Sequence, residues 1–67
     1  MFILLQDYAN GKQLVNLDNV IDIWTFDKDA FHDYSGTRVF FRDGKTIDVA
    51  ETVSEIYAKM SRSGITI

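Results

Sequence analysis

His32 is the residue whose chemistry is most easily named. It lies close to Asp29 and Asp33 in an acidic segment, and a histidine beside carboxylates can act as a general base or bind a metal. No serine or cysteine stands near it in a recognisable nucleophile motif, and the chain contains no cysteine at all. Because a lone polar-loop histidine is usually solvated, we interpret His32 as a loop residue without a catalytic role.

The same acidic segment offers carboxylates that could hold a cation. A calcium loop needs oxygen ligands at alternate positions, a central glycine and a distal glutamate. Between Asp27 and Asp33, Phe31 occupies the third ligand position, and both the glycine and the glutamate are missing. The pattern therefore predicts a solvated acidic loop and no metal site, with weak cation binding left as an open alternative.

The remaining composition offers little machinery for catalysis. The 4 glycines are scattered, so there is no glycine-rich phosphate loop. The lack of cysteine removes disulfides, thiolate metal sites and thiol catalysis together. A chain of 67 residues has a small core, and a domain of this size rarely builds a catalytic cleft. We predict a protein that is not an enzyme and uses no cofactor.

Nucleic-acid binding is the alternative function, because small sheets with exposed aromatic residues can stack bases. Arg38, Phe40 and Arg42 lie within five positions of one another. The formal net charge is −3, however, and phosphate contacts need a basic surface. The sequence therefore places a nucleic-acid-binding regulator second.

The elements that must position these residues are mostly strands. Runs rich in β-branched, aromatic and aliphatic residues are separated by Asn-Gly, Asp-Asn and Asp-Gly turns. Residues 27–36 are polar and predict a loop. The expected strands are Phe2–Leu5, Gln13–Leu17, Val20–Phe26, Thr37–Arg42 and Lys45–Ala50.

The pattern of the fourth and fifth strands selects their turn. A three-residue loop ending at a left-handed Gly44 sets Val39 opposite Ile47 and Arg38 opposite Asp48. Apolar residues then share one face, and the opposite charges pair on the other. We predict this bulged turn rather than a two-residue one.

The same test applies to the first hairpin. A three-residue loop ending at a left-handed Gly11 sets Leu5 opposite Val15 and Ile3 opposite Leu17. We predict this register.

In the last predicted element, the spacing of apolar residues changes from the period of two typical of a strand to the period of 3.6 typical of a helix. Thr52 and Glu55 have the spacing of a capping box, and Ser63-Gly64 ends the helix before an extended tail, 65–67. The apolar stripe of this amphipathic helix consists of Val53, Ile56, Tyr57 and Met60.

Together these elements predict one small α+β domain spanning residues 1–67. It has an antiparallel, strongly twisted sheet of about five strands, with two bulged hairpins and one C-terminal helix packed on one face. The expected core is Ile3, Leu5, Val15, Leu17, Val20, Ile23, Val39, Phe41, Ile47, Val49, Val53, Ile56, Tyr57 and Met60.

The aromatic residues exceed what so small a core can hold. The chain has 1 Trp, 3 Tyr and 5 Phe, and one helix covers only one face of the sheet, although the first strand is apolar on both. Aromatic and aliphatic side chains left outside are typical of protein interfaces. We predict a homodimer with interface residues Phe2, Leu4, Leu14, Trp24, Phe26 and Phe40.

Two stretches carry a resemblance to a known family. Residues 14–23 resemble the pattern hydrophobic-Asn-x-x-x-Ile-x-x-Ile of the small flagellar and swarming-motility proteins of bacteria, with Val20 at the first isoleucine position. Residues 43–56 resemble the closing half of those proteins, a glycine turn, a strand and then Glu-Ser/Thr-Val-x-Glu-Ile. Similar small proteins occur among prophage genes. The insertion at 27–36 departs from that pattern. The resemblance implies the fold and a bacterial or phage context, and it implies no catalytic residue.

These observations favour a non-catalytic protein-interaction or assembly module. The longest apolar run, residues 1–5, is far shorter than the ~20 residues of a membrane span. We expect a cytoplasmic protein that does not enter a membrane.

Overall fold

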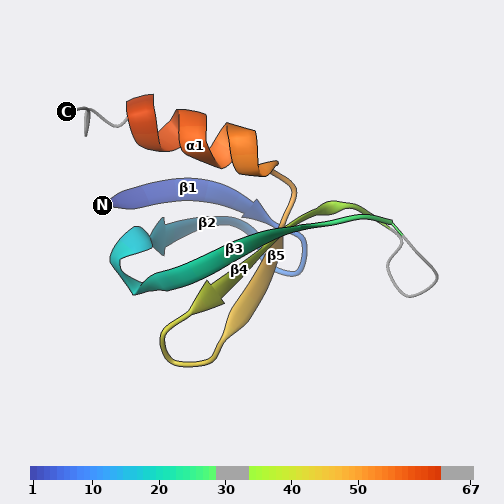
Figure 1. Ribbon diagram of the computed structural model, residues 1–67, viewed down its shortest axis with the longest axis horizontal. Helices are drawn as coiled ribbons and strands as arrows, with labels where there is room; N and C mark the ends of the chain where they lie inside the picture. The colour runs from blue at the N-terminus through green and yellow to red at the C-terminus, as the bar shows by residue number, and fades with distance from the viewer. Residues whose placement is uncertain (29–33, 63–67) are drawn as a thin grey trace.

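The computed structural model describes residues 1–28 and 34–62 and has the predicted α+β fold. Five antiparallel strands form one open sheet in the order β2-β1-β5-β4-β3, and one helix follows them (Figure 1). The elements are β1 (Phe2–Asp7), β2 (Gly11–Asn16), the 3-10 helix η1 (Leu17–Asn19), β3 (Val20–Phe26), β4 (Gly36–Phe41), β5 (Thr46–Val49) and α1 (Val53–Arg62).

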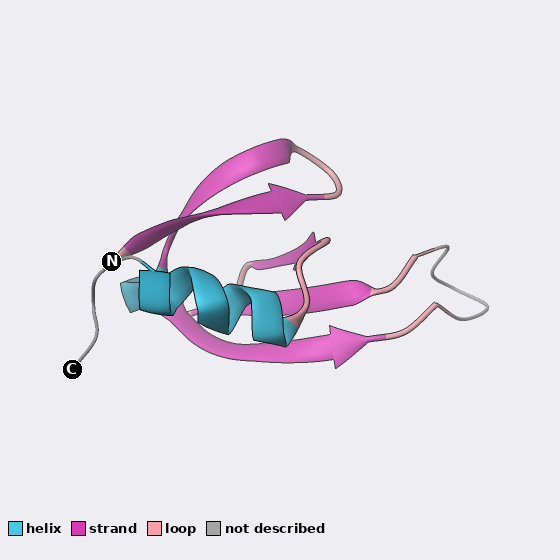
Figure 2. Ribbon diagram, turned by 90° about the horizontal axis from the view of Figure 1, so that it is seen from above, coloured by secondary structure: helices cyan, strands magenta, loops and turns pink. Residues whose placement is uncertain are grey.

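The sheet consists of two parts that meet at a narrow junction. β1 pairs with β2 along its whole length, but it pairs with β5 only at Asp7 and Val49. Figure 2 shows the β1–β2 ribbon diverging from the other three strands, with α1 lying across the opening. The helix contacts both β1 and β3, so it closes the space that the diverging strands leave.

The hydrophobic core fills this space. Side chains at alternate positions of the strands point inward, and Ile56 of α1 lies among them. The buried hydrophobic residues are Ile3, Leu5, Val15, Val39, Val49 and Ile56, and the half-buried ones packed against them are Met1, Leu17, Val20, Ile23, Phe41, Ile47 and Met60. Twelve of these were predicted from the sequence, and Met1 was not.

The prediction that Val53 and Tyr57 of the helix belong to the core is wrong. Tyr57 is 70% exposed and Val53 is 36% exposed, whereas Ile56 is 2% exposed. The helix rests on the face that carries Ile56 and Met60, four positions apart. Tyr57 is one position on from Ile56, about 100° around the helix axis, and Val53 is the first helical residue. The contacting face is thus narrower than the apolar stripe in the sequence.

The predicted register of the β4–β5 hairpin is confirmed. Val39 pairs with Ile47 and Arg38 with Asp48, while the Phe41 N–H donates to the Lys45 carbonyl at 2.9 Å. Gly44 has φ +89°, the left-handed conformation that the bulged turn requires.

The β1–β2 register is shifted by two residues from the prediction. Gly11 has the expected positive φ, +80°, but Ile3 pairs with Val15 and Leu5 with Gln13. The turn starts earlier, at residues 8–10. A shift of two residues leaves every side chain on its predicted face, because the period of a strand is two.

Asp7 is the physical cause of that shift. Its side chain is buried, 1% exposed, and its carboxylate accepts from the Ala9 N–H at 2.8 Å and from Asn10 Nδ2 at 3.0 Å. These bonds satisfy a buried carboxylate and fix the turn directly after β1. Leu17, expected to end a strand, instead begins η1, where the Asn16 side chain accepts from the Asp18 N–H.

The predicted capping box begins α1. The Thr52 hydroxyl accepts from the Glu55 N–H at 3.0 Å, and the Glu55 carboxylate accepts from the Thr52 N–H at 2.9 Å. The predicted helix stop at 63–64 and the tail at 65–67 lie outside the described residues.

Gly36 was expected in a loop, but it begins β4 and pairs with Phe26. A Cβ at this position would collide with the Val49 carbonyl and approach the Tyr8 ring at 3.3 Å. Only glycine therefore lets β4 start beside β5 at this point.

Substitution by alanine should lower the free energy of unfolding by different amounts at Gly44 and Gly36. Gly44→Ala meets no atom within 4 Å, so it should cost only backbone strain, about 1–2 kcal/mol. Gly36→Ala should lower the free energy of unfolding further, because the backbone of β5 must move. Urea unfolding of both variants checks this, and equal losses would contradict it.

The helix face gives a second prediction. Ile56→Ala should lower the free energy of unfolding by about 2–5 kcal/mol, a large share of the stability of a domain this small. Tyr57→Ala, on the neighbouring exposed position, should change it by less than about 0.5 kcal/mol. Thermal unfolding followed by circular dichroism measures both, and a Tyr57 effect as large as that of Ile56 would disprove the assigned face.

Candidate interaction surface

Three apolar side chains lie together on the outer face of the β1–β2 ribbon. Leu4 pairs directly with Leu14, and Phe2 is diagonal to Leu14 on the same face. Their exposed fractions are 57% for Phe2, 47% for Leu4 and 62% for Leu14. We call these three residues the β1–β2 patch. They are exposed because α1 packs on the inner face, against Ile3 and Leu5.

A second group lies on β3 and β4. Trp24 is 58% exposed and its ring is 5.1 Å from that of Phe40, centroid to centroid. Trp24 Nε1 donates to the Asp22 carboxylate at 2.9 Å, which satisfies the polar end of the indole. Phe26 is half-buried, with the Arg38 guanidinium 5.6 Å above its ring. We call Trp24, Phe26 and Phe40 the β3–β4 group.

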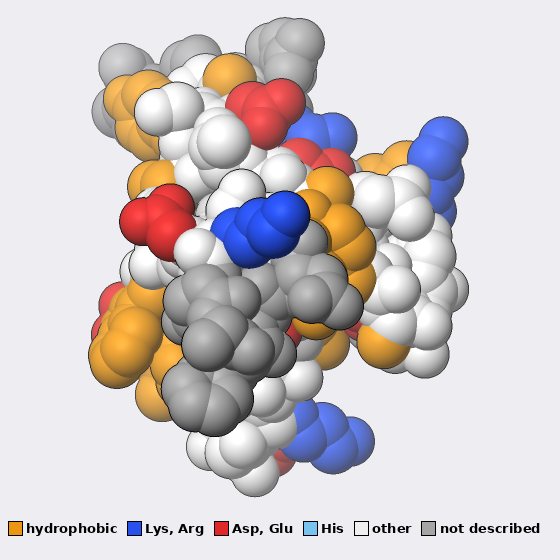
Figure 3. Space-filling model, turned by 90° about the vertical axis from the view of Figure 1, so that its right-hand side faces the viewer, with side chains coloured by type: hydrophobic (Ala, Val, Ile, Leu, Met, Phe, Trp, Pro, Cys, Tyr) orange, Lys and Arg blue, Asp and Glu red, His pale blue; other side chains and the backbone are white. Residues whose placement is uncertain are grey.

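The six predicted interface residues thus form two groups instead of one surface. They lie on strands that β5 separates in the sheet order. In the view of Figure 3, hydrophobic side chains lie in separate clusters with polar and charged side chains between them. The two groups therefore do not form one continuous patch. All three residues of the β1–β2 patch are exposed, whereas in the β3–β4 group only Trp24 is.

Other exposed apolar residues were not among the predicted interface residues: Tyr8, Ile21, Tyr34, Val53 and Tyr57. Tyr8 continues the alternation of Phe2 and Leu4 and could have been identified by that period of two. Ile21 could not, because a register irregularity between Val20 and Asp22 breaks the alternation there.

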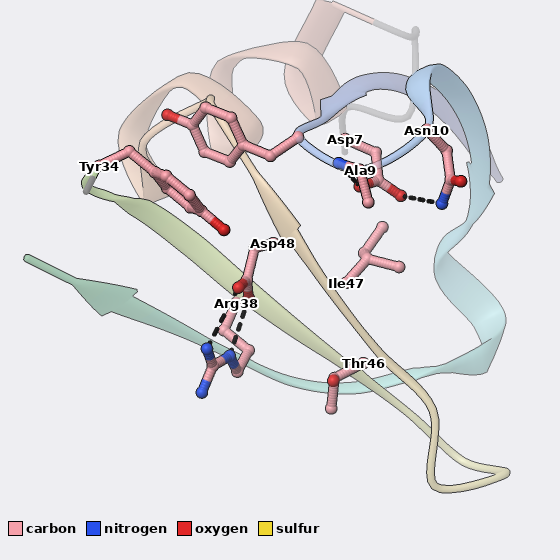
Figure 4. A pocket seen from close by; sticks show the side chains of 9 residues that line it. Asp7, Ala9, Asn10, Tyr34, Arg38, Thr46, Ile47 and Asp48 are labelled. Atoms are coloured by element: carbon pink, nitrogen blue, oxygen red, sulfur yellow. Dashed lines mark hydrogen bonds and ion pairs between the residues drawn. The ribbon is translucent and has the colours of Figure 1, made fainter. Parts of the chain in front are cut away.

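A shallow hollow of about 220 Å³ lies beside the junction of β1 and β5 (Figure 4). On one side the Tyr8 and Tyr34 rings are 4.0 Å apart, and the Tyr8 hydroxyl donates to the Ser35 carbonyl at 2.8 Å. On the other, Arg38 Nε and Nη2 donate to the two oxygens of Asp48 at 2.8 and 3.1 Å.

The charged groups of this hollow are already engaged with one another. The hydrogen bonds from Arg38 to Asp48, and next the attraction of their charges, raise the pKa of the Arg38 guanidinium above its ordinary value. Arg38 therefore remains a guanidinium cation. Asp7, also at the hollow, accepts from the turn after β1. The arrangement is that of a structural ion pair and a structural cap.

Most of the residues in the acidic segment that were considered for catalysis or metal binding lie outside the described residues. His32, Asp29, Phe31 and Asp33 belong to that part of the chain. Within 1–28 and 34–62, no group of three or more histidine or carboxylate side chains is placed to hold a metal ion. Asp27 is described and exposed.

Several basic side chains lie beside carboxylates. Arg38 pairs with Asp48, Lys45 Nζ is 3.9 Å from Asp43, and Lys59 Nζ is 3.9 Å from Glu51. The Arg42 Nε donates to the Asp18 carbonyl at 3.1 Å. Arg38, Arg42 and Lys45 belong to the β4–β5 hairpin and Lys59 belongs to α1; three of these four cations are paired with a carboxylate.

The chain matches no protein-family model, no curated protein and no solved structure. In the described part of the chain, no helix is long and apolar enough to cross a membrane.

The Arg38–Asp48 pair should be worth more than an ordinary surface pair. It is bidentate and its side chains are only 35% and 21% exposed, so a double-mutant cycle with alanine should give a coupling of about 0.5–1 kcal/mol. The Lys45–Asp43 pair, 82% and 59% exposed, is the control and should couple by less than about 0.3 kcal/mol. Urea unfolding at low salt measures both, and equal couplings would contradict the expectation.

Proposed function

We propose that this chain is a non-catalytic protein-interaction or assembly module that forms a homodimer through the β1–β2 ribbon, which carries the β1–β2 patch, in a bacterial or phage context. The observation that carries the proposal is the direct pairing of exposed Leu4 with exposed Leu14, with Phe2 beside them. Adjacent exposed apolar residues of this kind are typical of association sites. The resemblance of residues 14–23 and 43–56 to small motility and prophage proteins supports the biological context.

Charge also favours this surface for a second copy of the same acidic chain. β2, with the sequence Gly-Lys-Gln-Leu-Val-Asn, contains no carboxylate. The only carboxylate of β1 is Asp7, which is buried and hydrogen-bonded. Two chains of net charge −3 can therefore approach along these strands without bringing exposed carboxylates of the strands together.

The β3–β4 group is less suited to self-association. Asp22 holds the Trp24 indole and is itself exposed, and exposed Asp27 follows directly after β3. Two copies meeting at this group would bring four carboxylates close to one another, which costs free energy through like-charge repulsion.

Sedimentation equilibrium at micromolar concentration tests the proposal. The wild type should have the mass of a dimer, and Leu14→Glu should weaken dimerisation about 100-fold. Each interface residue occurs twice in a symmetric dimer, so a loss of about 1.4 kcal/mol per copy gives this factor.

Ile21→Glu is the matched control, because Ile21 is 61% exposed and Leu14 is 62% exposed. It should leave the dimer intact. Circular dichroism verifies that both variants remain folded. A monomeric wild type, or equal weakening by both variants, would overturn the proposal.

A further inference from the structure

We infer that two copies of this chain join edge to edge along β2, with Leu14 on the two-fold axis, so that two five-stranded sheets become one continuous sheet. This inference deepens the proposed self-association and rests on it. It specifies which backbone atoms and which residue pairs meet.

The direction of the backbone groups in β1 shows where those of β2 point. The Leu17 N–H donates to the Met1 carbonyl, so residues 1, 3, 5 and 7 form the hydrogen-bonded pairs with β2. The even-numbered residues bond on the side of β1 that faces β5. The Tyr8 N–H donates to the Asp48 carbonyl, and the Gln6 carbonyl accepts from the Ala50 N–H. Alternate residues of an antiparallel strand point to opposite edges.

It follows that Lys12, Leu14 and Asn16 direct their backbone N–H and C=O groups away from β1. β2 is the last strand of the sheet, and in the described residues no backbone bond or strand pairing is formed on that side. Such an edge is a template for another strand.

The sequence of β2 is compatible with pairing to itself. If Leu14 faces Leu14 of the second copy, Lys12 faces Asn16 and Asn16 faces Lys12. About six backbone hydrogen bonds then form, and neither lysine lies opposite a lysine. On the outer face, Leu4, Leu14 and their two counterparts make one row of four leucines across the joined sheet.

The opposite edge of the sheet lacks these properties. β3 has a register irregularity between Val20 and Asp22, and Asp22 would stand within any strand pair formed there. Bulges and charges are the devices by which edge strands avoid pairing. β2 has no such irregularity in its register with β1, and its one charged residue, Lys12, faces the neutral Asn16 of the second copy.

Cysteine cross-linking tests the geometry, because the chain has no cysteine of its own. In the inferred dimer the two Leu14 Cα atoms are about 5.5 Å apart, within the range that a disulfide spans. The two Leu4 positions are three strand spacings apart, about 14 Å. Under mild oxidation, Leu14→Cys should give a covalent dimer and Leu4→Cys at least ten-fold less.

A charge exchange at the axis is the second test. Leu14→Glu and Leu14→Lys should each be monomeric, because like charges then face each other. An equimolar mixture should form a heterodimer at least ten-fold more tightly than either variant alone forms a homodimer. Only a position that faces its own copy behaves in this way.

The outcomes separate the two proposals. Equal cross-linking of Leu4→Cys and Leu14→Cys, or no heterodimer in the mixture, would overturn edge pairing and leave self-association standing if the wild type is a dimer. A wild type that is monomeric in sedimentation equilibrium would overturn both.

Discussion

The narrow junction between β1 and β5 is the constraint on which the rest of the structure depends. One residue pair, Asp7 with Val49, joins the two parts of the sheet, and the strands diverge beyond it. Glu51 extends the junction by one step, because its carboxylate accepts from the Gln6 N–H at 2.9 and 3.0 Å. The Glu51 side chain thus accepts the hydrogen bond that a neighbouring strand would otherwise accept from Gln6. Beyond this point the strands diverge, and Ile56 fills the space between them.

The features that could be predicted from the sequence are those set by local chemistry. Alternation assigned the strand faces, and the two left-handed glycines and the capping box followed from turn and cap patterns. The register of the first hairpin was predicted wrongly, because the prediction rested on Asn10-Gly11 alone. The Asp7 side chain bonds the residues two and three positions after it and starts the turn there, a local signal that the prediction did not weigh. The exposure of Tyr57 depends on how α1 is rotated over the sheet, which the apolar stripe does not define.

The candidate interaction surface likewise has some features that follow from local patterns and others that depend on how the strands are arranged. The outward position of Phe2, Leu4 and Leu14 follows from the alternation of β1 and β2, and these residues were identified correctly as exposed. Their separation from Trp24 follows from the order of the strands, in which β5 lies beside β1. No local pattern reports that order, since the pairing of β1 with β5 joins residues far apart in the chain.

The distance along the chain between Gln6 and Glu51, 45 residues, also affects how the domain reaches its fold. The two hairpins close short loops, whereas the junction must bring distant segments together at a larger entropic cost. Contacts of high sequence separation slow folding, so the hairpins are able to form before the junction closes. In a chain that had formed only its hairpins, the edge of β1 that faces β5 would have no partner, and the Glu51 carboxylate is one of the groups that cover this edge in the folded domain.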